Sequence, residues 1–203
     1  MIIAVDGPAA SGKGTIARAL AAHYGLAWLD TGLLYRAVGV ACGRAGGDPD
    51  RADDALAACA FSDDLLADPE LRSEAAGGWA SRVSVHPSVR AALLARQREF
   101  AAQPNGAVLD GRDIGTVIVP HADAKLFVTA SAEVRAARRV NEGQSESYAA
   151  ILADITARDA RDSSRSAAPL IAAQDADLLD TSDMTIRAAV QRAIALVEAR
   201  VRP

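Results

Sequence analysis

A phosphate-binding loop is predicted near the amino terminus, where Gly7–Thr15 reads GPAASGKGT. Its glycines leave room for a close approach of the backbone to an anion, so that several N–H groups can point inward at it. The helix that must follow adds a partial positive charge at its N-terminus. Lys13 is spaced to reach the outer phosphates of a nucleotide, and Thr15 offers a hydroxyl on the magnesium side.

The loop departs from the strict phosphate-loop pattern at one position, because Gly14 stands between Lys13 and the hydroxyl of Thr15. Nucleoside monophosphate kinases often carry this variant, so the loop resembles those small kinases more than nucleotide switches or motor proteins. The apolar run Ile2–Asp6 predicts a strand before the loop, and Ile16–Ala22 continues a helix after it. These flanking elements are the context that the motif requires.

Asp110 is the next candidate functional residue, a carboxylate at the end of the apolar run Ala107–Asp110. An apolar strand that ends in an acid is typical of the Walker B element, whose carboxylate holds magnesium, usually through water, beside the phosphate loop. Other acidic residues gather between positions 50 and 68, and their spacing matches no calcium loop. We interpret them as a solvated acidic face.

Arginines fall at the ends of predicted elements or in turns, of the kind that gather around a phosphate. A single surface arginine more often serves solubility than chemistry. Phosphoryl transfer, however, is catalysed chiefly by positioning and by positive charges that stabilise the moving group. The set therefore favours phosphoryl transfer, and its members are Arg36, Arg90, Arg112, Arg158, Arg161 and Arg165.

Composition limits the class of protein. The chain has 203 residues, of which 50% are hydrophobic, a net charge of −4 and a pI near 5.4. We expect a single α/β body whose partner is a small molecule. The negative net charge gives it no general attraction to nucleic acid or to anionic membranes. Cys42 and Cys59 lack the spacing of a zinc site and are interpreted as reduced thiols. The amino terminus reads as a strand, not a signal peptide, and no apolar run approaches about 20 residues, so a cytoplasmic protein is predicted.

The elements that must position these residues alternate between strands and helices. In such α/β sheets, ligands bind beyond the carboxyl ends of the strands, where Asp30, Thr31 and Arg36 are expected. The stretch 50–81 looks helical and acidic but gives no clearer pattern. Strands are predicted at 2–6, 26–29, 107–110, 125–129 and 176–180, and helices at about 12–24, 33–44, 87–100, after Ser131, from 147 into 158–165, and at 185–200.

A family resemblance emerges from five segments, which follow one another along nearly the whole chain. They are IAVDGPAASGKGT, LDTGLLYRAV, SVRAALLARQREF, VLDGRDIGTV and ARDARDSSRSAAPL, and together they resemble the bacterial (d)CMP kinases, or cytidylate kinases. The last two are the specific ones, because shikimate, gluconate, adenylate and dephospho-CoA kinases share the loop alone. The stretch 50–78 departs from the family, being shorter than in other members and lacking strand signals.

The resemblance implies a P-loop kinase fold, a five-stranded, mostly parallel sheet flanked by helices. It implies a single domain over residues 1–203, with a monophosphate-binding segment at 46–100 and a short lid at 158–167. The implied reaction is in-line transfer of a phosphoryl group from ATP to CMP or dCMP, without a protein nucleophile. The partners would be these nucleotides and Mg²⁺, with no nucleic acid and no membrane, and the protein would be a monomer.

The resemblance also implies roles for individual residues. The ATP-binding residues would be Gly7, Pro8, Ala9, Ala10, Ser11, Gly12, Lys13, Gly14 and Thr15, with Mg²⁺ on Thr15 and, through water, on Asp110. The acceptor would be bound by Thr31, Arg36, Ser81, Arg90, Arg112, Asp113, Arg158, Asp162 and Arg165. The catalytic residues would be Lys13, Arg112, Arg158 and Arg165.

Within this set, Arg36 and Arg112 would grip the acceptor phosphate, and Ser81, Arg90 and Asp113 would read the base. Cytosine has an exocyclic amine that donates beside acceptors at N3 and O2, which suits a carboxylate that accepts and a guanidinium that donates. Alternatives remain: a kinase of another acceptor such as UMP or shikimate, a nucleotide switch, although the sequence has no NKxD-type motif, and a binding protein that has lost turnover.

Overall fold

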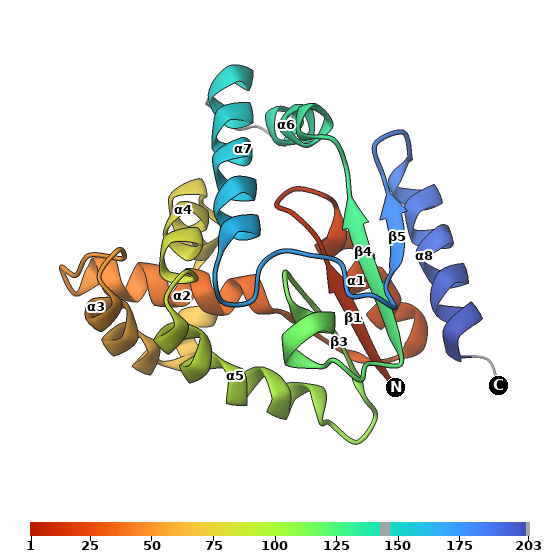
Figure 1. The fold of residues 1–203 in the computed structure, drawn as a ribbon, viewed down its shortest axis with the longest axis horizontal. Helices are drawn as coiled ribbons and strands as arrows, with labels where there is room; N and C mark the ends of the chain where they lie inside the picture. Colours follow the sequence, from red (N-terminus) through yellow and green to blue (C-terminus); the bar gives the residue numbers. More distant parts are fainter. Residues whose placement is uncertain (143–146, 202–203) are drawn as a thin grey trace. The chain divides into compact units, whose positions relative to one another are not determined.

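The structure, a computed structural model, describes residues 1–142 and 147–201. The chain forms two compact units, which we call the sheet unit and the helical unit. The sheet unit comprises Met1–Leu29 and Phe100–Pro203, and the helical unit comprises Asp30–Glu99. The helical unit, orange to yellow-green in Figure 1, is therefore inserted into the sheet unit at one point of the sequence.

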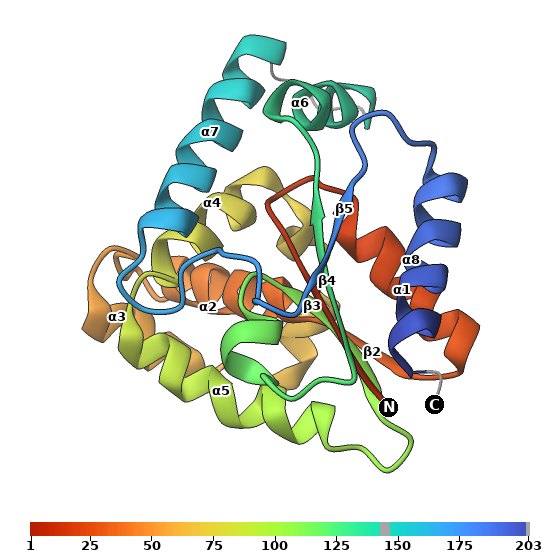
Figure 2. The ribbon, with the colours of Figure 1, turned by 45° about the vertical axis from the view of Figure 1, so that its right-hand side comes forward.

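The sheet has five strands: β1 (Ile2–Asp6), β2 (Ala27–Asp30), β3 (Ala107–Gly111), β4 (Ala124–Thr129) and β5 (Asp177–Asp180). Their order is β2-β3-β1-β4-β5, so that β1 lies in the middle (Figure 2). β1 pairs in parallel with β3 and β4, and β4 pairs in parallel with β5. β1 and β3 are buried along almost their whole length, as apolar strands with both faces covered should be. The predicted five-stranded, mostly parallel sheet is confirmed.

Two helices, α1 (Lys13–Tyr24) and α8 (Ile186–Val201), pack side by side against the sheet (Figures 1 and 2). Ile16 and Leu20 of α1 and Val197 of α8 are buried in one apolar cluster with the strands. Removing side chains of this size from water stabilises the folded state by roughly 1.5–3 kcal/mol each. The cluster thereby fixes α1, and with it the loop that precedes α1.

Two further helices, α6 (Ala132–Asn141) and α7 (Tyr148–Ser164), pack against each other beyond the carboxyl end of β4 (Figure 2). Each is capped by a serine, Ser131 or Ser147, whose hydroxyl accepts a hydrogen bond from a backbone N–H three residues later. Because β1 and β4 are parallel neighbours, α6 begins at the sheet edge where β1 ends. The helix predicted after Ser131 is confirmed, and Ser131 caps it.

The helical unit is built from α2 (Thr31–Arg44), α3 (Ala52–Ala57), α4 (Glu74–Val83) and most of α5 (Pro87–Ala101), with the 3₁₀ turns η1 (Ala58–Ala60), η2 (Asp63–Ala67) and η3 (Pro69–Arg72) between α3 and α4. Residues 31–99, all of them described, contain no strand. α2 and α4 approach so closely that a Cβ on Gly39 would lie 2.6 Å from the Cβ of Trp79. Glycine at position 39 therefore sets the spacing of the two helices.

Most predicted boundaries agree with the structure to within two residues, and the differences have simple causes. α1 ends before Gly25, as predicted, because Gly25 is left-handed (φ 65°) and its N–H bonds to the carbonyl of Ala21. α2 begins at Thr31 instead of 33, because the chain passes directly from the end of β2 at Asp30 into the helix, with Gly32 in its first turn. The stretch 50–81 is helical, as predicted.

The other expectations about the chain concern its thiols and its helices. Cys42 and Cys59 are both free. Within residues 1–142 and 147–201, every helix is too short or too polar to cross a membrane.

The close packing at Gly39 gives a test of the helical unit. Gly39→Ala should lower the free energy of unfolding by about 1–3 kcal/mol, because the new methyl group has no space beside Trp79. Gly43→Ala, one turn later in α2, is the matched control: its Cβ would meet only ring carbons of Trp79 at 3.7–4.0 Å. This control should be neutral or stabilise by up to about 1 kcal/mol through helix propensity. Urea denaturation measures both, and equal stability of the two variants would contradict the prediction.

Candidate active site

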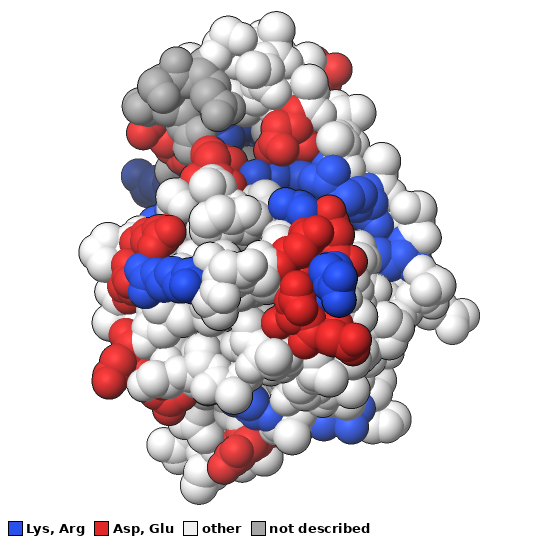
Figure 3. All heavy atoms as spheres, turned by 90° about the vertical axis from the view of Figure 1, so that its left-hand side faces the viewer, with Lys and Arg blue, Asp and Glu red and all other residues white. Residues whose placement is uncertain are grey.

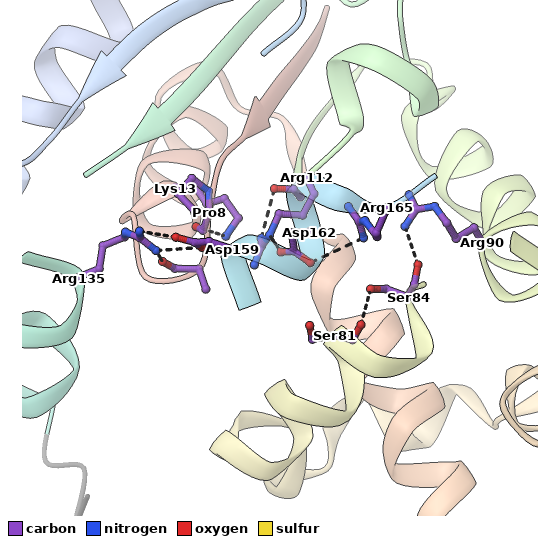
Figure 4. Close-up of polar contacts among 12 residues, drawn as sticks. Pro8, Lys13, Ser81, Ser84, Arg90, Arg112, Arg135, Asp159, Asp162 and Arg165 are labelled. Atoms are coloured by element: carbon purple, nitrogen blue, oxygen red, sulfur yellow. Dashed lines mark hydrogen bonds and ion pairs between the residues drawn. The ribbon is translucent and has the colours of Figure 1, made fainter. Parts of the chain in front are cut away.

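The predicted phosphate loop connects β1 to α1 in a conformation that its glycines permit. A Cβ on Gly7 (φ 153°) would overlap the carbonyl oxygen of Val128 on β4. Gly12 is left-handed (φ 87°) and directly precedes α1. The Nζ of Lys13 donates to the carbonyl oxygen of Pro8, 3.4 Å away, so the lysine side chain folds back across the loop (Figure 4). An ammonium group and a helix N-terminus thus meet at one tight turn, as an anion site requires.

Two hydroxyl groups of the loop fit a phosphate ligand. The Oγ of Ser11 is buried and has no hydrogen-bond partner in the part of the chain that the structure describes. A buried hydroxyl without a partner is unfavourable, so a ligand or water that bonds to it is expected. Thr15 lies exposed in the first turn of α1, where its hydroxyl is accessible.

The carboxylate of Asp110 lies against the same turn. It pairs in register with Val5 of β1 and is almost completely buried. The indole Nε1 of Trp28 donates to Oδ1 of Asp110 at 2.8 Å. The other oxygen, Oδ2, faces the helix start, since it is 3.7 Å from the position that a Cβ on Gly14 would take. The geometry agrees with a Walker-B-like carboxylate beside the phosphate loop.

The described residues contain no group of three or more His, Cys, Asp or Glu side chains that could hold a metal ion by themselves. A divalent ion at this site would therefore depend on nucleotide phosphates and water for most of its ligands. This is the usual way in which Mg²⁺ binds, because the ion dehydrates reluctantly. One carboxylate oxygen at Asp110 and the hydroxyl of Thr15 fit such a site.

Asp162 gathers two of the predicted phosphate-binding arginines in the sheet unit (Figure 4). The Nε of Arg112, directly after β3, donates to Oδ2 of Asp162 at 2.8 Å. The Nη1 of Arg165 lies 3.9 Å from Oδ1 of the same carboxylate. Asp162 and Arg165 are both buried, so the pairing with Asp162 offsets the unfavourable burial of the guanidinium charges. Arg112 belongs to the motif DGRDIGT at 110–116, and Asp162 and Arg165 belong to the motif RDxRDxxR at 158–165. The two motifs thus meet at one place.

Asp113 and Arg158, also predicted to bind the acceptor, are buried in the same unit. The Nε of Arg158 lies 2.8 Å from Oδ2 of Asp154, one turn earlier in α7. Residues 158–164 of the predicted lid form the last two turns of α7, which ends at Ser164. The lid at 158–167 stays a prediction.

Asp6 is a functional candidate that the sequence pattern indicated only as the end of a strand. Its carboxylate accepts hydrogen bonds from the N–H groups of Ile114 and Gly115, both at 2.8 Å, in the π-helical turn η4 (Ile114–Ile118). Burial, the main cause, raises the pKa of Asp6 to about 6, although the two N–H bonds favour the charged form. Asp6 therefore anchors the turn that directly follows Arg112 and Asp113. In the sequence, the signal for such a role was the position of this acid directly before the phosphate loop.

The remaining predicted residues belong to the helical unit. The Nη1 of Arg36 donates to the carbonyl oxygens of Leu71 and Ser73, at 2.9 and 3.0 Å. Thr31, the first residue of α2, is buried. The carbonyl groups thus fix the guanidinium of Arg36 where η3 leads into α4.

Ser81 and Arg90 lie around the junction of α4 and α5 (Figure 4). The Oγ of Ser84 donates to the carbonyl oxygen of Ser81 at 3.1 Å, and the Nη1 of Arg90 lies 3.4 Å from the carbonyl oxygen of Ser84. The guanidinium of Arg90 also lies over the ring of Tyr35, 5.5 Å from its centroid. The predicted base-reading pair of this unit is therefore linked through one serine.

Two arginines of α6 contact the loop, although no sequence pattern assigned them to the site. The Nη1 of Arg135 donates to the carbonyl oxygen of Ala9 at 3.2 Å, and the Nη1 of Arg138 lies 3.4 Å from that of Ser11. Their spacing on a helix indicates a shared face but not what that face contacts. These contacts span more than a hundred residues of sequence, which no local pattern can predict.

Comparison with known proteins identifies related chains. A family model described as Cytidylate kinase matches residues 3–199. The chain is 57% identical over 202 residues to the cytidylate kinase of Azorhizobium caulinodans, covering 98% of each chain. It is 58% identical over 205 residues to the cytidylate kinase of Xanthobacter autotrophicus, again covering 98% of each.

Among solved structures, an uncharacterized protein from Eubacterium ventriosum superimposes with a TM-score of 0.59. The match covers 98% of this chain and 99% of the other, at 15% sequence identity. A likeness at this identity concerns the fold alone.

The raised pKa of Asp6 gives a test by pH. A carboxyl group with a folded pKa near 6 and an unfolded pKa near 3.9 stabilises the fold fully below about pH 4 and loses that contribution as the pH rises through 6. Asp6→Asn removes this titration. The free energy of unfolding of the wild type, minus that of Asp6→Asn, should therefore fall by about 2 kcal/mol between pH 4 and pH 7. Urea denaturation across this range measures it, and a difference independent of pH would contradict the assignment.

Proposed function

Since the chain belongs to the cytidylate kinase family, we propose that it transfers the γ-phosphoryl group of ATP to CMP or dCMP, giving ADP and CDP or dCDP. The observation that carries the proposal is the cluster of Arg112, Asp162 and Arg165. It joins the two motifs that distinguish cytidylate kinases from other kinases with the same loop. The named relatives favour this reaction over a kinase of UMP or shikimate and over a nucleotide switch.

ATP would bind at the loop Gly7–Thr15. Its backbone N–H groups and the N-terminus of α1 would hold the phosphates, and Lys13 would exchange its contact with Pro8 for the outer phosphates. A preorganised ammonium group at that place stabilises the negative charge that develops on the transferred group. Lys13 is for this reason the residue to which we assign the largest part of the chemistry.

Mg²⁺ bound together with ATP would neutralise charge on the phosphate oxygens. Thr15 and Asp110 are the residues that would hold it, the second through water. Trp28 would keep Asp110 in place, since its indole N–H donates to one carboxylate oxygen, while the other faces the start of α1.

The acceptor would be bound by arginines that already face carboxylates or carbonyl groups. Arg112 and Arg165 are held by Asp162, and Arg36 by two backbone carbonyls, so their orientation is limited before a phosphate arrives. Limiting their motion in advance lowers the entropic cost of binding. Arg158 and Asp162 would bind the sugar, while Ser81, Arg90 and Asp113 would bind the base.

We propose that the protein is a monomer that acts in the cytoplasm. Its partners would be free nucleotides, and it would bind neither nucleic acid nor a membrane. The net charge of −4 gives no general attraction to polyanions. On the face shown in Figure 3, Asp and Glu side chains lie beside most of the Lys and Arg side chains, and one larger group of Lys and Arg lies at the upper right. In the helical unit, Arg44 pairs with Asp68 and Arg82 pairs with Asp50, so these cations are already neutralised locally.

Replacing Lys13 tests the chemistry. Lys13→Ala should lower kcat by roughly 10³-fold or more while the protein stays folded, because a preorganised charge that stabilises the transition state is removed. A coupled assay of ADP release measures kcat, and circular dichroism reports the fold. Arg187→Ala, which removes an exposed cation of α8, is the control and should leave kcat unchanged. A folded Lys13→Ala variant within tenfold of the wild type would rule out the loop as the catalytic site.

Replacing Asp113 tests the specificity. Uracil has an acceptor at O4 where cytosine has a donor, so a carboxylate placed for cytosine would face an oxygen. The wild type should prefer CMP to UMP by about 10² or more, and Asp113→Ala should reduce this ratio of kcat/KM by at least about tenfold. Asp113→Asn, which keeps the shape of the buried side chain, repeats the test if the alanine variant is unstable. An unchanged ratio in a folded variant means that the base is recognised elsewhere.

A further inference from the structure

Arg135 makes a set of contacts that reaches from the phosphate loop to α7. Its side chain is buried, with the residue 4% exposed. Its Nη1 donates to the carbonyl oxygen of Ala9 at 3.2 Å and to Oδ1 of Asp159 at 3.2 Å, and its Nη2 donates to Oδ2 of Asp159 at 2.6 Å (Figure 4). Its Nε donates to the carbonyl oxygen of Ala130 at 2.9 Å. The guanidinium therefore holds three separate segments at once.

The planar shape of the guanidinium makes this connection rigid. A bidentate pair with a carboxylate fixes both distance and orientation. Because the same group also bonds to Ala9, a shift of Asp159 moves the cation that the Ala9 carbonyl faces. A single donor on a flexible stem could not transmit such a shift.

The loop needs support of this kind. Ala10, the residue after Ala9, has a left-handed backbone with φ 58°. Such a conformation is unfavourable by about 1–3 kcal/mol for a residue with a Cβ, and it persists only where the surroundings enforce it. The hydrogen bond from Arg135 to Ala9 fixes the peptide group that joins these two residues.

The other end of the connection lies beside the proposed acceptor residues. Asp159 follows Arg158 in α7 and stands one turn before Asp162, which holds Arg112 and Arg165. One turn of helix thus separates the carboxylate that Arg135 binds from the carboxylate that gathers the phosphate-binding arginines.

We propose that Arg135 is a positioning residue that couples the ATP loop to the acceptor-binding residues of α7, so that a nucleoside triphosphate in the loop raises the affinity for the nucleoside monophosphate. This proposal rests on the proposed function. Coupling of this kind is reciprocal: the acceptor must raise the affinity for the triphosphate by the same factor.

Arg138 provides a matched comparison on the same helix. Its Nη1 lies 3.4 Å from the carbonyl oxygen of Ser11 and 3.1 Å from Oγ1 of Thr181, and its Nη2 donates to the carbonyl oxygen of Thr181 at 2.6 Å. It therefore contacts the loop as Arg135 does, but its partner follows β5 instead of lying in α7. Weakening Arg138 should affect the loop without disconnecting α7.

The test measures binding by isothermal titration calorimetry. CMP is titrated into the protein alone and into the protein saturated with Mg²⁺ and a non-hydrolysable ATP analogue, and the ratio of the two Kd values is the coupling factor. The wild type should give a factor of about five or more. Asp159→Asn and Arg135→Lys should bring the factor to within twofold of one, and Arg138→Lys should keep the wild-type value. Titrating the analogue with and without CMP should give the same factors.

Asp159→Asn decides the question even where Arg135→Lys is unstable, since it retains Arg135 and its bonds to Ala9 and Ala130. A wild-type factor of one, or an unchanged factor in folded Asp159→Asn, overturns the coupling role. If the wild type phosphorylates CMP but Asp159→Asn keeps its coupling, only this inference fails. If the wild type neither binds nor phosphorylates CMP, the proposed function fails as well.

Discussion

The close approach of β1 and β4 at Gly7 is the constraint on which the rest of the site depends. Because a side chain at Gly7 would overlap the carbonyl oxygen of Val128, the chain can leave the central strand there only as glycine. It then turns within a few residues into α1, which begins at Lys13. β1 has β3 on one side and β4 on the other, and both are parallel to it. Asp110 at the end of β3 and α6 beyond β4 are therefore brought beside the loop by strand pairing alone.

The sheet unit also contains buried pairs of oppositely charged side chains. Asp162 holds Arg112 and Arg165, and Asp159 holds Arg135. An unpaired cation at such depth would be strongly unfavourable, so the carboxylates make it possible to keep guanidinium groups oriented beside a phosphate site. Cations held in advance stabilise charge that develops during phosphoryl transfer, without first having to reorganise.

The buried carboxylate of Asp6 is stabilised differently, because its hydrogen-bond partners are two backbone N–H groups and not a cation. Burial raises the pKa of Asp6 to about 6, although the two N–H bonds favour the charged form. The result is a firm link between the end of the central strand and the turn η4. Through η4 this link supports Arg112 and Asp113, which come just before it in sequence.

Local patterns in the sequence predicted much of this arrangement. The strand, the glycine-rich turn and the helix around Lys13 could be predicted because each is encoded by adjacent residues. The helix ends at Gly25 and Ser131 were predictable for the same reason. The hydrogen bonds from η4 to Asp6 and from Arg135 to Ala9 could not be predicted, since they join residues 108 and 126 positions apart. Helical spacing shows that two arginines share a face, but only the packing of α6 against the loop and α7 determines what that face contacts.

If this chain phosphorylates a cytosine nucleotide with ATP, the identity of the products shows it most directly. The protein is incubated with ATP, Mg²⁺ and an equimolar mixture of CMP, dCMP and UMP, and the nucleoside diphosphates derived from each acceptor are separated by chromatography over time. CDP and dCDP should accumulate first and exceed UDP by about 10² in initial rate. Equal rates for UDP and CDP, or ADP formation without any pyrimidine diphosphate, would contradict this prediction.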